Sequence, residues 1–122
     1  MRKLETLWDF KTARFRVLVN AVEDDITDLS WDEDGSVKAG LDSGKLVKFG
    51  VVCTVYLVGR EVGSDSIWGC VYESYSAFVD HRGIKAHSPK SGSYFSDVVR
   101  EAIADARRVV TSFKLVHLRE VL

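Results

Sequence analysis

The most concentrated group of chemically active side chains in the sequence is a run of carboxylates near residue 30. Seven acids and no base stand within twelve residues, with a tryptophan among them: Glu23, Asp24, Asp25, Asp28, Trp31, Asp32, Glu33 and Asp34. Because the whole chain carries a net charge of −1, the residues outside this acidic segment (23–34) sum to +6. The chain is therefore electrically polarised although it is nearly neutral.

Calcium binding is one chemistry that such a run of carboxylates supports, because Ca²⁺ takes oxygen ligands. The core Asp32-x-Asp34-Gly35 resembles the middle of an EF-hand loop. With Gly35 at the sixth loop position, Ser30 and Leu41 fall at positions one and twelve, where that loop needs carboxylates. We therefore predict no metal site and no cofactor.

Recognition of a basic partner is a second chemistry open to the acidic segment. Carboxylates spaced along a loop imitate nucleic-acid phosphates, or pair with the lysines and arginines that normally grip them, and such pairing steers association. Trp31 is the kind of aromatic residue that anchors interfaces. The simpler alternative is a solvated loop ahead of a helix, with Trp31 turned into the core. Both stay open, and the leading functional hypothesis is a protein partner with a basic surface.

Conventional catalytic and metal motifs were sought elsewhere in the chain. The three histidines, His81, His87 and His117, lack the HExxH and CxxC patterns of zinc sites. The glycine-containing loop 83–92 does not match a phosphate-binding loop, and no nucleophile elbow is present. We predict no catalytic residue and no enzyme. The alternative is a small enzyme or ligand-binding domain that uses the 81–92 loop.

Basic side chains in the C-terminal part suggest a further alternative, a nucleic-acid-binding protein. Arg82, Lys85, Lys90 and Arg107 would be its phosphate contacts. These residues belong to no recognised nucleic-acid-binding motif, and the helical arginines share their helix with acids at compatible spacing. We therefore expect no direct nucleic-acid binding.

Length and composition predict one domain that covers residues 1–122. Its apolar fraction of 46% and charged fraction of 29% are those of an average globular protein. No stretch approaches the roughly 20 apolar residues that span a bilayer, and no apolar segment of a secretory signal follows the basic N-terminus. We expect a cytoplasmic protein without membrane contact, either a monomer or a homodimer.

Alternation of apolar residues predicts the sheet that must position these side chains. Residues 13–22 and 47–57 alternate with a period of two, and a third strand is expected around 66–73, after a turn between Gly59 and Gly63. Consecutive strands with short connections favour an antiparallel meander of three or four strands.

Apolar residues at spacings of three and four predict a long amphipathic helix over residues 93–113. Its apolar side is formed by Phe95, Val98, Val99, Ala102, Ile103, Ala106, Val109, Val110 and Phe113. We expect this helix to cover one face of the sheet, which gives an α+β fold. The tail 114–122 either extends the helix or returns as an edge strand.

Two shorter helices are also expected. Ser30 and Glu33 have the spacing of a capping box, so a helix is predicted to begin at Ser30, to turn Val37 and Leu41 inward, and to end at Gly44. Residues 76–82 are expected to add another turn or two of helix.

Cys53 and Cys70 are predicted to be buried free thiols. Both fall in strands that a tight turn near Val58-Gly59 makes neighbours. In that hairpin the two residues lie several pairs apart, beyond the roughly 7 Å between Cα atoms that a disulfide allows.

Three stretches of the sequence, taken together, are familiar. They are DLSWD (28–32) followed by Gly35, GCVY (69–72), and GSYFSD (92–97) running into EAI (101–103). As a set they resemble a family of small uncharacterised proteins from bacteria, plasmids and phages, over residues 14–108. The resemblance carries over no catalytic residue. Because such mobile-element proteins are often inhibitors of host defence, it implies an anti-CRISPR-like inhibitor of a nucleic-acid-targeting complex.

Overall fold

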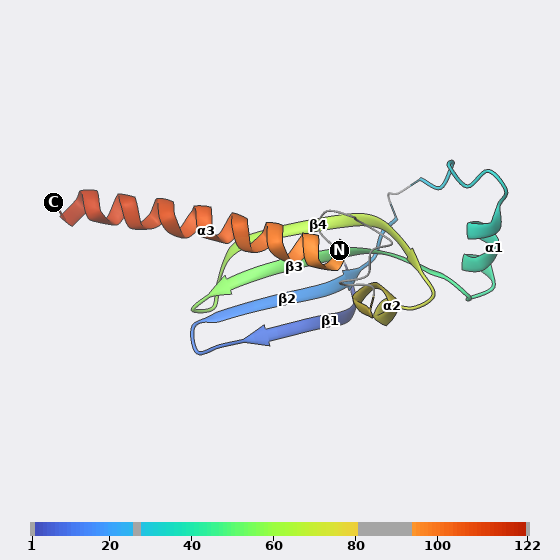
Figure 1. Ribbon diagram of the computed structural model, residues 1–122, viewed down its shortest axis with the longest axis horizontal. Coiled ribbons are helices and arrows are strands. Elements are labelled where there is room, and N and C mark those ends of the chain that lie inside the picture. The colour runs from blue at the N-terminus through green and yellow to red at the C-terminus, as the bar shows by residue number, and fades with distance from the viewer. Residues whose placement is uncertain (1, 26–27, 81–93, 122) are drawn as a thin grey trace.

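Four strands form one antiparallel sheet, in the order β1-β2-β3-β4, in a computed structural model that describes residues 2–25, 28–80 and 94–121, with side chains as far as Phe113. The elements in chain order are β1 (Lys3–Lys11), β2 (Phe15–Val22), α1 (Ser36–Asp42), β3 (Val47–Leu57), β4 (Arg60–Tyr72), α2 (Tyr75–Asp80) and α3 (Tyr94–Val121). The predicted α+β fold with an antiparallel sheet and a long C-terminal helix is confirmed (Figure 1).

The core lies between one face of this sheet and the first half of α3. Alternate residues of β2 and β3 face the helix, as the period of two predicted. The helix packs one apolar stripe against them. The buried residues of this core are Val17, Val19, Ala21, Phe49, Val51, Cys53, Val55, Cys70, Phe78, Phe95, Val98, Ala102 and Ala106. Each large side chain buried in this way stabilises the fold by roughly 1.5–3 kcal/mol.

The hairpin between β3 and β4 has the tight turn expected near Val58-Gly59, but β4 begins earlier than predicted. Val58 and Gly59 form its two-residue turn, with φ angles of 51° and 78°, and β4 then runs without a break through Gly63. Gly63 therefore lies in the strand and does not bracket the turn. A Cβ atom there would stand 2.5 Å from the backbone nitrogen of Ala106, so the glycine permits α3 to approach the strand.

The long helix extends beyond the sheet. α3 continues to Val121, so the residues after Phe113 lengthen the helix and the alternative of an edge strand is wrong. Among the α3 residues whose side chains the structure describes (94–113), the last buried one is Ala106. Val109 and Phe113, which the helical spacing placed on the buried side, are 46% and 71% exposed, because they lie at the end of the sheet, beside Leu57, Arg60 and Val62 at the β3–β4 hairpin. The rest of α3 continues past the sheet (Figure 1).

The first short helix begins later than the capping box predicted. Ser30 lies in a turn, and α1 begins at Ser36, after Gly35 with a φ of 71°. Val37 and Leu41 do not reach the core, since no residue of α1 is buried. This helix is held away from the sheet.

The second short helix contributes to the core. In α2, Phe78 is 1% exposed and makes edge contacts with Phe49, Tyr72 and Phe95, at ring-centre distances of 6.0, 5.4 and 6.2 Å. The predicted loop 83–92 lies outside the described residues.

The two cysteines follow the prediction. Cys53 pairs with Asp65 across the β3–β4 hairpin and Cys70 pairs with Phe49, and both are buried and free. Burial raises the pKa of each thiol to about 12, so neither is an activated nucleophile. None of the described helices is long and apolar enough to cross a membrane.

Candidate partner-binding surface

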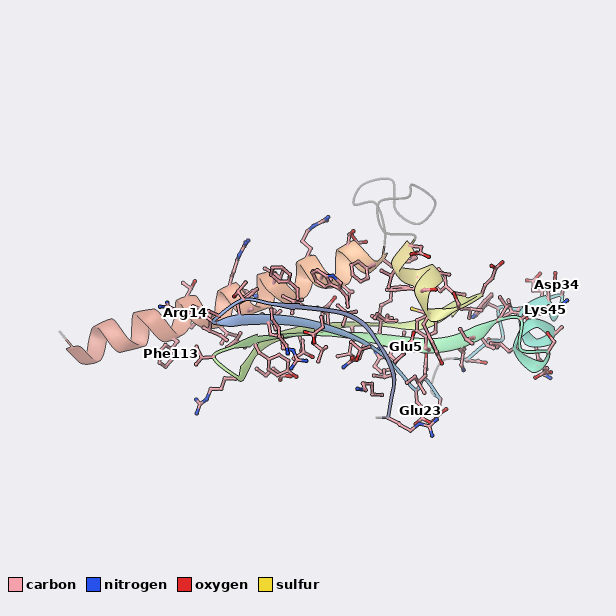
Figure 2. All side chains as sticks on the ribbon, turned by 90° about the horizontal axis from the view of Figure 1, so that it is seen from below. Glu5, Arg14, Glu23, Asp34, Lys45 and Phe113 are labelled. Carbon is pink, nitrogen blue, oxygen red and sulfur yellow. The ribbon has the colours of Figure 1, made fainter. Side chains whose placement is uncertain are left out.

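The acidic segment leads into an arm that leaves the sheet after β2 and returns at β3. This arm, residues 28–46, carries α1 and stands at one end of the molecule, opposite the C-terminal end of α3 (Figure 1). Figure 2 shows Asp34 and Lys45 on the arm and Phe113 near the opposite end.

Two acids of the segment belong to the body of the fold. Asp24, which the sequence placed on the partner-binding surface, is only 4% exposed, and its Oδ2 accepts a 2.7 Å hydrogen bond from the Gly69 amide. Glu23 forms an ion pair of 2.7 Å with Arg2. The predicted role of Asp24 in surface contact is therefore wrong, and that of Glu23 is weakened by its own basic partner.

Three aspartates on the arm shape its backbone. Asp32 accepts hydrogen bonds from the Val37 and Lys38 amides, at 3.3 and 3.0 Å, which satisfies two donors at the start of α1 where Gly35 offers no side chain. Asp28 and Asp34 each accept from the amide two residues ahead, at 3.0 Å. The bond from the Ser36 amide is the main cause of a lowered pKa at Asp34, so that carboxylate stays charged.

Five carboxylates of the segment therefore lie at the surface of the protein. We call these five the arm carboxylates: Asp25, which lies just before the arm, and Asp28, Asp32, Glu33 and Asp34, which lie on it. Asp32 is half-buried and the others are exposed. Within the described part of the chain, no ion pair joins any of the five to a lysine or arginine. Lys38 lies on the arm but pairs with Asp42, at 2.8 Å.

Trp31 is turned away from the core. It is 57% exposed, so the alternative that buries it is wrong. Together with Trp68, Tyr72 and Tyr94, it lines a hollow of about 400 Å³ beside β4. The arm thus presents a large aromatic side chain among charged ones, next to further aromatic surface.

Sequence reasoning missed Trp68 and Tyr94 as members of this surface. Trp68 was placed on a strand and Tyr94 at a helix start, and neither position indicated that the arm would bring Trp31 beside them. One available signal was the pair Trp68-Gly69, because a glycine inside a strand often marks a bulge. Gly69 does adopt a positive φ of 72°.

The other candidates are not brought to this surface. His81, His87, Arg82, Lys85 and Lys90 all lie outside the described residues, as does the side chain of His117. Arg107 is exposed on α3 and does not line the hollow beside β4. Among described residues, no three His, Cys, Asp or Glu side chains are grouped as metal ligands.

Comparisons of the chain with protein families, curated proteins and solved structures found no match. The resemblance to proteins of mobile elements therefore stays an expectation from the sequence. The function of this surface is inferred from its own side chains.

Proposed function

We propose that this protein is a non-catalytic binding protein that docks its arm on a basic surface of another protein. The observation that supports this function is the set of five arm carboxylates, which have no basic partner among the described residues and surround an exposed tryptophan. A negative patch of this kind attracts a positive surface and disfavours phosphate.

The arm is suited to binding because part of its geometry is already fixed. Three of its carboxylates accept hydrogen bonds from nearby amides, so their positions are held before a partner arrives. Pre-ordering lowers the entropy lost on association. Attraction between exposed charges acts over a screening length of about 8 Å at physiological ionic strength, so it steers the encounter and weakens as salt is added.

The partner surface has the chemistry of a nucleic-acid-binding groove. Lysines and arginines that bind phosphates also bind carboxylates that have a similar spacing. An inhibitor of a nucleic-acid-handling defence complex is the form of this proposal that agrees with the resemblance of the sequence.

The test is an affinity measurement on a partner captured from the host and then purified. A neutralised arm variant carries Asp25→Asn, Asp28→Asn, Asp32→Asn, Glu33→Gln and Asp34→Asn. Asparagine keeps one oxygen acceptor, so the single bonds accepted by Asp28 and Asp34 survive while the charge is lost. Asp32 accepts through both of its oxygens, so the asparagine there keeps one of its two bonds. Asp24 is left in place because it is buried.

A matched control neutralises five exposed acids outside the arm and changes net charge equally. Its substitutions are Glu5→Gln, Glu61→Gln, Glu73→Gln, Asp80→Asn and Glu101→Gln. If each arm carboxylate contributes ~0.5 kcal/mol, the arm variant binds roughly 70-fold more weakly than the wild type. The control variant should bind almost normally. Equal affinities of the two variants, or an affinity independent of salt, would contradict the proposed function.

A further inference from the structure

The aromatic hollow beside β4 is formed by three parts of the chain that are distant in sequence. Trp31 comes from the arm, Trp68 and Tyr72 from β4, and Tyr94 from the first turn of α3. Trp31, Trp68 and Tyr94 are 57%, 39% and 40% exposed, so part of each ring remains open to solvent. A volume of about 400 Å³ is within the usual range of ligand sites.

An irregularity in β4 creates one wall of the hollow. Phe49 pairs with Cys70 and Val51 pairs with Ile67, so β4 has one residue more than β3 between these pairs. This bulge holds Trp68 directly over Gly50, where a Cβ atom would stand 2.3 Å from the indole ring. The position of Trp68 is therefore fixed by the sheet, and β4 is the last strand of that sheet.

Negative charge lies behind this wall. Asp24 is buried, and its carboxylate contacts the amide of Gly69, which lines the hollow. Burial, with a smaller contribution from the charge of Asp24, raises the pKa of Cys70, another lining residue. Asp28, Asp32 and Glu33 flank Trp31 on the arm. Aromatic faces backed by carboxylates favour a cation over an anion or a neutral group.

We propose that this hollow binds the guanidinium group of an arginine side chain on the partner, an inference that rests on the proposed function and specifies its central contact. Guanidinium is planar, stacks on aromatic rings and is less strongly hydrated than an ammonium group. It therefore enters an aromatic site at a smaller cost in lost water than lysine. The arm carboxylates attract the basic surface, and the hollow selects one side chain from it.

The experiment is a titration of the full-length, ¹⁵N-labelled protein followed by NMR. The probe is Nα-acetyl-arginine amide, and the matched control is the citrulline analogue, which has almost the same shape without the charge. The chain has three tryptophans, so Trp8, which packs against Phe10 and Phe95 away from the hollow, is an internal reference. We expect saturable shifts of the Trp31 and Trp68 indole signals at millimolar probe and none at Trp8.

Two variants locate the binding. Trp31→Ala changes an exposed side chain on the arm, and Trp68→Ala removes the wall over Gly50. Each should weaken arginine binding by roughly tenfold, the upper range for losing one cation–aromatic contact. Unchanged amide signals in β2 and β3 show that a variant is folded. If Trp68→Ala does not fold, Trp31→Ala alone decides the question.

Several outcomes would overturn the inference. They are an absence of shifts, equal shifts with citrulline, binding of the lysine analogue as strong as that of arginine, and a Trp31→Ala variant that binds arginine normally. Failure of the proposed function looks different. In that case the neutralised arm variant still binds the protein partner, whatever the arginine titration shows.

Discussion

Asp24 and Gly69 lie 45 positions apart in the sequence and are joined by a 2.7 Å hydrogen bond from the Gly69 amide to the Asp24 carboxylate. The bond ties the chain that follows β2 to the bulge in β4. It therefore anchors the base of the arm and the wall of the aromatic hollow at one point. Asp24, which the sequence assigned to the surface, is therefore a structural residue that joins the arm to the hollow.

Replacement of Asp24 by alanine should destabilise the fold. The Gly69 amide would lose a charged acceptor, and leaving such a group unsatisfied costs about 1–3 kcal/mol. Urea unfolding of the variant measures this loss. Asp25→Ala is the control, because Asp25 is an exposed neighbour and should change the free energy of unfolding by less than about 0.5 kcal/mol. Equal losses in the two variants would contradict the anchoring role.

Asp32→Ala should loosen α1 without affecting the rest of the protein. The variant removes two acceptors at the start of the helix, a change worth about 0.5–2 kcal/mol of helix stability. Hydrogen exchange of the Val37 and Lys38 amides should accelerate accordingly. The global unfolding midpoint should hardly move, because α1 buries no residue. Asp32→Asn, which keeps one of the two oxygen acceptors, should restore only part of the protection.

The buried thiols should make stability fall at high pH. In the unfolded chain they ionise near pH 9, whereas in the folded protein burial raises the pKa of both to about 12. Between these values the folded state keeps protons that the unfolded chain releases, so rising pH favours unfolding. The contribution of the protonated thiols to the free energy of unfolding is fully present below pH 9 and is lost progressively up to pH 12.

Unfolding free energies measured across this window give the size of the effect. Each thiol adds a slope of at most about 1.4 kcal/mol per pH unit. A variant with Cys53→Ala and Cys70→Ala should be less stable at neutral pH but should show a shallower slope above pH 9. A thiol reagent applied to the native wild type below pH 9 should react far more slowly than with the urea-unfolded chain. Rapid labelling of the native protein would rule out buried thiols.

The regular elements were predictable because their sequence patterns follow one period. Alternate residues are buried in β2 and β3, and residues at spacings of three and four are buried in the first half of α3. The bounds of these elements differ little from those predicted. β1 was missed because its pairing with β2 shifts twice, between Lys3 and Glu5 and between Thr6 and Trp8. These irregularities break the alternation, although Leu4, Leu7 and Trp8 all pack on the core.

The site was predictable only in part because its residues meet through tertiary structure. The sequence identified the charges and Trp31, which are local features. It did not indicate that Asp24 would be buried, since the amide that binds it is 45 positions away. The helix start predicted at Ser30 was wrong, because the capping pattern is short. Asp32 accepts hydrogen bonds from the first amides of α1 instead.

The same substitution should destabilise the protein strongly in the first half of α3 and very little near Phe113. Phe95, 5% exposed, contacts Trp8 and Phe78 at ring-centre distances of 5.8 and 6.2 Å, whereas Phe113 is 71% exposed at the end of the sheet. Phe95→Ala should therefore cost about 3–5 kcal/mol, as for other buried phenylalanines. Phe113→Ala should change the free energy of unfolding by less than about 0.5 kcal/mol, as for exposed positions.

Urea denaturation of the two variants, at the same protein concentration, makes the comparison direct. The change in helix propensity from Phe to Ala is less than about 1 kcal/mol at either position, so a difference of several kcal/mol reflects burial. A large loss for Phe113→Ala that grows with protein concentration would mean that a second molecule covers this end of α3. A large loss at every concentration would mean that the end of α3 packs within the chain, which would contradict a helix that extends past its sheet.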